Sequence, residues 1–168
     1  MRALLSGFAL FGICLSTVAA FAQQAPADPQ TSTVSCSFDD DKQISVQYYP
    51  ASPKEKMQNG KVWTPGGHPM ILYTQTEVTL ADKEIPIGAF SMYTIPGKQT
   101  WTLIVNKNVT PGAQYDEKDD LARATMETGQ LSDAENSFSV VFGHIGPKLC
   151  SIRFYAGKVG AWAEFTEK

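Results

Sequence analysis

Residues 88–106 read GAFSMYTIPGKQTWTLIVN, which is two runs of β-branched and aromatic residues around a central Pro-Gly pair. Residues of these types favour extended strands. In the second run, Trp101, Leu103 and Val105 share one face, and Thr102, Ile104 and Asn106 share the other. This period of two is typical of a strand that buries one face in a core. We therefore predict two strands here, with Trp101 in the core.

The Pro-Gly pair predicts how the two runs are joined. Pro96 fixes its own φ at about −65°, and Gly97 tolerates the positive φ that the next position of a type II turn requires. We therefore expect a tight type II turn and a β-hairpin over residues 88–106.

Similar runs recur outside this hairpin. Residues 43–49 alternate cleanly, with Ile44, Val46 and Tyr48 on one face. Further runs cover residues 70–76, 77–80, 138–142, 149–155 and 159–165, and turns are expected at 81–84 and 156–158. About eight short strands with frequent turns are typical of an antiparallel β-sandwich. The predicted fold is therefore all-β and jelly-roll-like, with at most one short helical turn.

The predicted helical turn lies within residues 116–120. Asp116 can accept a hydrogen bond from the first free amides of such a turn, and Asp119 follows three residues later. We expect an extended run from Leu121 onward. The acidic residues here could also supply oxygen ligands to calcium, but they lack the alternating order of a dedicated calcium loop. A solvated helix cap is the favoured interpretation.

The beginning of the chain is typical of an export signal. It has a basic residue at Arg2, an apolar run, and small residues up to Ala22. We predict a cleaved signal peptide over residues 1–22, a flexible leader over 23–32, and one domain over 33–168. The alternative is a retained membrane anchor, because the apolar run approaches the ~20 residues that cross a bilayer.

The cysteines agree with export. Of the three, Cys14 lies in the signal peptide, which leaves Cys36 and Cys150. In an oxidising compartment an even pair predicts a disulfide. A redox-active pair is the alternative, but it favours a closer spacing such as Cys-x-x-Cys. We expect a structural Cys36–Cys150 disulfide in a periplasmic or extracellular protein that leaves the membrane after signal cleavage.

The charge balance argues against a nucleic-acid partner. The chain has 14 Lys and Arg against 17 Asp and Glu, for a formal net charge of −3. Binding to phosphates needs a concentrated basic surface, and no cluster of Lys and Arg appears. The partners that remain open are a small molecule, a glycan or an envelope protein.

Motifs for catalysis are sparse. There is no Gly-x-Ser-x-Gly sequence, and the two histidines, His68 and His144, have no metal-ligand spacing to a second histidine or a cysteine. We therefore assign no catalytic residue, no metal and no cofactor. The alternative is a metal-dependent or acid–base hydrolase that uses His68 with a carboxylate brought near by folding.

The loop at residues 63–69, WTPGGHP, is the candidate binding site, because ligand sites on β-sandwiches commonly lie on loops. The indole of Trp63 could stack on a ligand or cover the end of the sandwich. His68 could contact a ligand or brace the loop. We name Trp63, Gly66, Gly67 and His68 as binding candidates. They favour a non-enzymatic binding or envelope-associated domain; a purely structural protein is a further alternative.

Four blocks of the sequence, in this order, resemble a family of secreted bacterial domains, the domains of unknown function 2911. The blocks are GKVW at 60–63, IPIGAFSMYTIPG at 85–97, WTLIVNK at 101–107 and YD at 115–116. The resemblance covers roughly residues 33–166. It implies export and a β-rich fold, and it implies no particular reaction.

The chain departs from the family pattern directly after GKVW. In the family this segment usually reads Arg-x-Gly-Ala-Asn-Glu, whereas residues 64–69 read TPGGHP here. The Arg, the Asn and the Glu are all absent. If the family has a polar site at this loop, this chain has altered or lost it.

Overall fold

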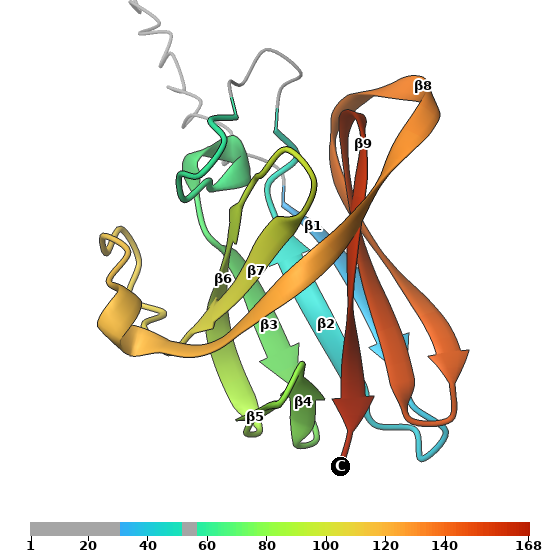
Figure 1. Cartoon of the computed structure of the whole chain (residues 1–168). Coiled ribbons are helices and arrows are strands. Elements are labelled where there is room, and N and C mark those ends of the chain that lie inside the picture. Colours follow the sequence, from blue (N-terminus) through green and yellow to red (C-terminus); the bar gives the residue numbers. More distant parts are fainter. Residues whose placement is uncertain (1–30, 52–56) are drawn as a thin grey trace, which may run out of the picture.

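The structure is a computed structural model that describes residues 31–51 and 57–168. The predicted signal peptide and nearly all of the predicted leader lie outside the described residues. Within them the chain is antiparallel β-structure with two short 3-10 turns (Figure 1). The all-β prediction is confirmed, with one more helical turn than expected. No helix in this part of the chain is long and apolar enough to span a bilayer.

Nine strands in the described part form one sheet in the order β1-β2-β3-β6-β7-β8-β9-β4-β5. Their bounds are β1 Ser32–Ser37, β2 Gln43–Tyr48, β3 Met70–Thr74, β4 Val78–Leu80, β5 Lys83–Ile85, β6 Gly88–Ile95, β7 Trp101–Asn106, β8 Asp120–Gly146 and β9 Leu149–Glu167. The 3-10 turns are η1 Pro65–Gly67 and η2 Glu117–Asp119.

Strands β8 and β9 are far longer than the others. They link strands β1, β2, β3, β6 and β7 on one side of the strand order to β4 and β5 on the other. The start of β8 pairs with β7, and its residues 127–130 pair with residues 159–162 of β9. Residues 139–146 of β8 pair with the start of β9, and the end of β9 pairs with β4. Figure 1 shows β8 crossing from the side of β6 and β7 to the side of β9.

The turn predicted over residues 156–158 is wrong, because β9 continues through it. Gly157 has a φ of 58° and stands opposite Glu135, in a stretch where the β8–β9 register shifts. A glycine at positive φ permits such an irregularity without ending the strand. The β8–β9 hairpin turns at Pro147 and Lys148 instead.

The hairpin over residues 88–106 forms as β6 and β7, but its connection is not the expected type II turn. Gly97 does not have a positive φ, and the connection extends over residues 96–100. A Cβ atom at Gly97 would collide with the carbonyl oxygen of Thr100. Glycine is needed here for this close approach. The turn expected at 81–84 is also shorter, since β5 begins at Lys83.

The helical turn predicted near Asp116 is confirmed as η2. The Asp116 carboxylate accepts a hydrogen bond of 3.0 Å from the backbone N–H of Lys118, as a capping residue does. The extended run that follows is the beginning of β8. The other turn, η1, was not predicted; it lies in the candidate loop.

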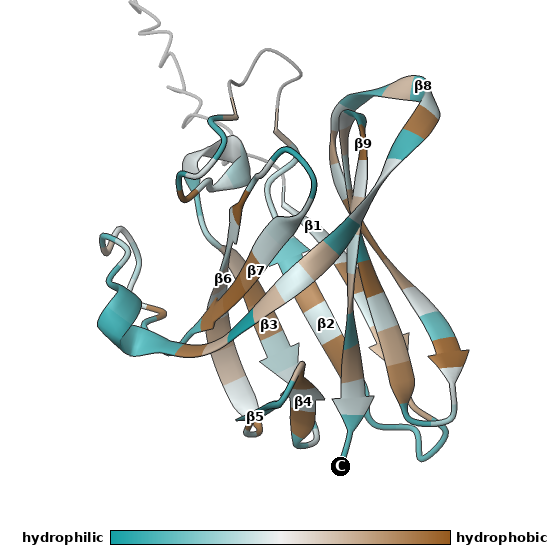
Figure 2. Ribbon diagram, in the orientation of Figure 1, coloured by the Kyte–Doolittle hydropathy of each residue, from teal (hydrophilic) through white to brown (hydrophobic). Residues whose placement is uncertain are grey.

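The buried apolar side chains form one hydrophobic core, to which strands β2–β7 and the long strands β8 and β9 both contribute. Trp101 is only 2% exposed, which confirms its predicted place. In Figure 2, apolar and polar bands alternate along β2, β8 and β9, as expected for strands with one face in the core. The core includes Ile44, Val46, Leu72, Met92 and Leu103 from the β2–β7 side, and Phe138, Val140, Ile152, Phe154 and Phe165 from β8 and β9.

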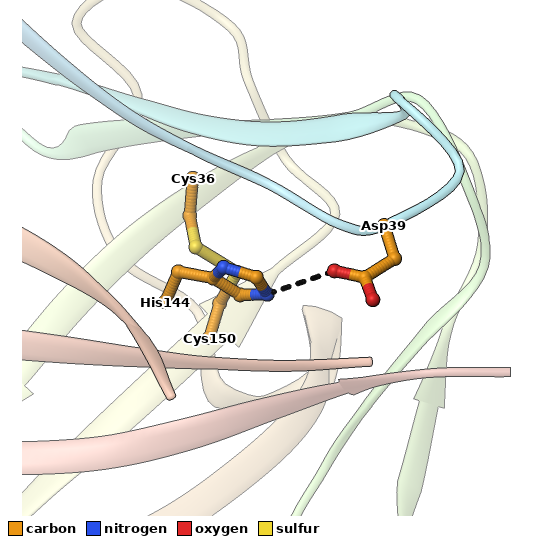
Figure 3. The surroundings of a disulfide bond; sticks show 4 residues. All are labelled: Cys36, Asp39, His144 and Cys150. Atoms are coloured by element: carbon orange, nitrogen blue, oxygen red, sulfur yellow. Dashed lines mark ion pairs between the residues drawn. A yellow bond between two sulfur atoms is a disulfide. The ribbon is translucent and has the colours of Figure 1, made fainter. Parts of the chain in front are cut away.

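The predicted disulfide joins Cys36 of β1 to Cys150 of β9, with their Cα atoms 6.2 Å apart (Figure 3). Both cysteines are buried. Beside them, the N–H of Asp39 donates to the carbonyl of Pro147 at 3.0 Å, and Nε2 of His144 lies 3.4 Å from Oδ1 of Asp39. These contacts fasten the edge strand β1 to the β8–β9 hairpin.

Replacing both Cys36 and Cys150 with Ala is expected to lower the free energy of unfolding by about 4–5 kcal/mol. The bond closes a loop with a sequence separation of 114 residues, and a loop of this size restricts the unfolded chain strongly. Urea unfolding of the variant and of the oxidised protein measures the difference. A double variant that unfolds at the same urea concentration as the parent would contradict this.

Candidate functional site

The candidate loop is anchored to the sheet at Trp63. The N–H of Trp63 donates to the carbonyl of Thr94 at 2.7 Å, and the N–H of Thr94 donates back at 3.3 Å. This bridge ties the start of the loop to β6. The rest of the loop therefore projects from a fixed point.

The structure places the indole of Trp63 in the core. Trp63 is 8% exposed, and its ring packs edge-on against Trp101 and Phe138, at centroid distances of 6.1 and 5.2 Å. A ring buried in this way has little surface for stacking on a ligand. Of the two roles that the sequence left open, the geometry favours covering the end of the core.

The two glycines of the loop have different surroundings. Gly66 has a φ of 70°, and a Cβ atom there would lie 2.7 Å from the Cβ of Tyr49. Gly66 therefore allows the loop to pack closely against Tyr49. Gly67 has a φ of 79° and nothing within 4 Å of its Cβ position, so it borders open space.

His68 is exposed and lies against an aromatic ring. Its imidazole is 4.5 Å from the ring of Tyr49, centroid to centroid, with 36° between the planes. Among the described residues no carboxylate forms an ion pair or hydrogen bond with it. A hydrolytic base would need such a partner to orient the ring. The geometry therefore gives the hydrolase alternative no support.

The second histidine lies elsewhere. His144 sits beside the disulfide, and its charge partner is Asp39 (Figure 3). The structure does not bring the two histidines into a common ion pair or ring contact. No group of three or more His, Cys, Asp or Glu side chains suited to a metal occurs within residues 31–51 and 57–168.

His68, Gly67 and Thr64 line a cleft of about 330 Å³, which we call the His68 cleft. Its opposite wall comes from the segment after β7, and Tyr93 of β6 also lines it. Pockets that bind small ligands have volumes of about this size. The lining residues are Val62, Thr64, Gly67, His68, Pro69, Tyr93, Gly112, Ala113, Gln114 and Tyr115.

The opposite wall is held by a buried asparagine. The side-chain Nδ2 of Asn106 donates to the carbonyl of Asp116 at 2.9 Å and to Oδ1 of Asp120 at 2.8 Å. Its Oδ1 accepts from the N–H of Asn108 at 2.9 Å, and Ser91 Oγ donates to the carbonyl of Asn108 at 2.6 Å. Segment 107–119 is thereby tied to the end of β7 at Asn106 and to β6 at Ser91.

Tyr115 forms the end of this wall and is fixed by charged partners. Its hydroxyl donates to Oδ2 of Asp120 at 2.8 Å and accepts from Nη2 of Arg123 at 2.6 Å. Nε of Arg123 also donates to Asp120 at 2.7 Å. The ring of Tyr115 lies 4.9 Å from that of Tyr93, centroid to centroid.

The surroundings raise the pKa of both tyrosines above the ordinary value of 10. Burial raises the pKa of Tyr115 to about 12, and the hydrogen bond to Asp120 and the charge of that carboxylate act in the same direction. Arg123 opposes them. Burial also raises the pKa of Tyr93. Each hydroxyl therefore retains its proton to a higher pH than an ordinary tyrosine does.

The sequence analysis missed Tyr93, Asn106, Tyr115 and Arg123 as residues of this region, and it covered Asp120 only within the predicted helical turn at 116–120. Asn106 follows the alternating pattern of β7, which says nothing about its side-chain partners. One signal was present: a polar amide at the end of a strand, directly before a long polar segment. Such residues often organise the loop that follows.

Replacing Tyr115 with Phe is expected to reduce the loss of stability in alkali. Because the folded pKa exceeds the unfolded value of 10, this proton stabilises the fold below pH 10, and the contribution is lost as the pH rises toward 12. Ultraviolet titration of tyrosinate and unfolding at each pH measure the effect. Tyr73→Phe, which alters an exposed tyrosine, is the control. Equal alkaline profiles for the two variants would contradict this assignment.

Comparison with known proteins identifies the family of this chain. No curated protein and no solved structure matches the chain. A family model described as a protein of unknown function, DUF2911, matches residues 29–161. The matched range includes both walls of the His68 cleft and the β6–β7 hairpin. This confirms the family resemblance, and the chain belongs to the family of domains of unknown function 2911.

Proposed function

We propose that this domain is a non-enzymatic binding module that holds a small neutral molecule with a polar ring, such as a sugar, in the His68 cleft. The observation that carries the proposal is the convergence of His68, Tyr93 and Tyr115 on one cavity of about 330 Å³. The rings supply apolar surface, and Thr64 and Gln114 supply polar groups. Ligand pockets commonly combine these two features.

The cleft is supported on both sides before any ligand arrives. The Trp63–Thr94 bridge fixes one wall, and the hydrogen bonds of Asn106 fix the other. A preorganised site loses less conformational entropy when it binds. The arrangement therefore suits recognition by loops on a rigid sheet.

The lining also contains no carboxylate or amine side chain. A charged ligand would lack a direct partner of opposite charge there, and so the cleft favours a neutral molecule. The positions at which the family pattern has Arg, Asn and Glu hold Thr64, His68 and Pro69 in this chain, and all three line the cleft. The ligand of this chain should therefore differ from that of relatives that keep the pattern.

Export is the second part of the proposal. We infer that the protein acts in the periplasm or outside the cell after removal of residues 1–22. The buried Cys36–Cys150 disulfide supports this, because such bonds persist in oxidising compartments. The predicted signal peptide supports it independently.

His68→Ala is expected to weaken binding of a neutral sugar by about tenfold, because it removes one polar contact and one stacking surface. Glucose, galactose, mannose and N-acetylglucosamine serve as probes in the millimolar range. Amide signals of the mature protein should shift in NMR spectra at residues 62–64, 66–68 and 112–115.

His144→Ala is the matched control, because it removes the other histidine at a site outside the cleft. It should bind as the parent does. The proposal fails if no probe shifts these amides, or if His68→Ala and the parent respond equally.

Expression of the full chain in a bacterial host is expected to give a periplasmic protein whose first residue is Gln23. Osmotic-shock fractionation and N-terminal sequencing measure this. Ala22→Tyr should block processing, because the cleavage site needs a small residue there. A membrane-bound chain that keeps residues 1–22 would support the retained anchor, and a cytoplasmic chain with reduced thiols would reject export.

A further inference from the structure

A second hollow, of about 440 Å³, lies over strands β8 and β9 and shares no lining residue with the His68 cleft. We call it the Trp162 hollow. Its size is typical of a small-ligand pocket, and its lining is more apolar than polar. The sequence analysis named none of its residues.

Two glycines that face each other across the strands create the space. Gly129 of β8 is paired with Gly160 of β9. Both follow the alternation of the outer face, since Ala161 next to Gly160 belongs to the core. With no side chain at either position, neighbouring side chains can lie directly on the backbone of the sheet at this point.

Aromatic side chains lie on this part of the backbone. A Cβ atom at Gly129 would lie 3.3 Å from the Trp162 ring, and one at Gly160 would lie 3.4 Å from the Tyr155 ring. The rings therefore rest against the backbone where the glycines permit it. Trp162 and Tyr155 are both only half-buried, so each retains surface that faces the hollow.

One cation completes the site. Arg153 lines the hollow and is exposed. Within the described part of the chain it forms no ion pair and no side-chain hydrogen bond. No Asp or Glu lines the hollow; Glu127, opposite Trp162 in the β-ladder, lines a neighbouring one. The guanidinium is therefore available to the carboxylate of a bound ligand.

We propose that the Trp162 hollow binds an acidic sugar ring, of the hexuronate class, with its apolar face on Trp162 and Tyr155 and its carboxylate on Arg153. Apolar surface and one unpaired cation are complementary to a ring that carries one negative charge. Gln130, at the rim, offers an amide to the ring hydroxyls. This site is independent of the neutral-ligand cleft at His68.

Tryptophan fluorescence can follow this site selectively. Of the three tryptophans, Trp63 and Trp101 are 8% and 2% exposed, and so Trp162 should dominate any response to a surface ligand. Titration of the mature protein with glucuronate in the millimolar range should change the emission saturably. The amide signals of Gly129 and Gly160 should shift with the same midpoint in NMR spectra.

Arg153→Gln should weaken glucuronate binding by about tenfold or more, because it removes a charge-assisted hydrogen bond. Lys158→Gln is the matched control: it removes one positive charge from β9 at an exposed position that does not line the hollow. Circular dichroism confirms that both variants are folded. His68→Ala should retain the full response, which separates this site from the His68 cleft.

Three outcomes would overturn the proposal. The first is no saturable change in fluorescence or in the glycine amides. The second is equal binding of glucose and glucuronate, which would remove the role of the charge. The third is equal binding of benzoate and glucuronate, which would make the ligand an aromatic acid instead of a sugar.

Discussion

The connection between the first strand and the last hairpin is the constraint on which the rest of this structure depends. In the strand order, β1 is an edge, and an edge strand exposes unpaired backbone groups. The Cys36–Cys150 bond and the Asp39–Pro147 hydrogen bond hold that edge against β8 and β9. The N–H of Phe138 also donates to the carbonyl of Ala51 at 3.2 Å. The core is enclosed because the sheet cannot open along this side.

The enclosed core fixes the positions of the loops that line the His68 cleft. Trp63 can anchor its loop only because its ring fits among Trp101 and Phe138, which come from distant parts of the chain. Asn106 can organise the opposite wall because its side chain is almost fully buried, where an unpaired amide would be costly. The same packing that stabilises the domain therefore shapes the His68 cleft.

The sequence was informative where local pattern and local chemistry agree. The β6–β7 hairpin, the place of Trp101, the cap at Asp116 and the disulfide all follow from periodicity, capping chemistry or cysteine pairing. It failed where the outcome depends on distant partners. A glycine is required at position 97 because the Thr100 carbonyl approaches so closely. The chain stays extended through Gly157 only because β8 runs alongside it. The partners of Asn106 and Arg123, likewise, belong to tertiary structure.

Glycines at two places in this fold have different consequences for the neighbouring side chains. At Gly66 the space is filled by Tyr49, so the gain is close packing within the protein. At Gly129 and Gly160 the rings of Trp162 and Tyr155 cover the backbone, a known way to offset the weak strand preference of glycine. Stabilisation alone, however, would be served by burying these rings fully, and it requires no cation. Half-buried rings in a hollow that an unpaired Arg153 also lines fit better with a surface that a ligand completes.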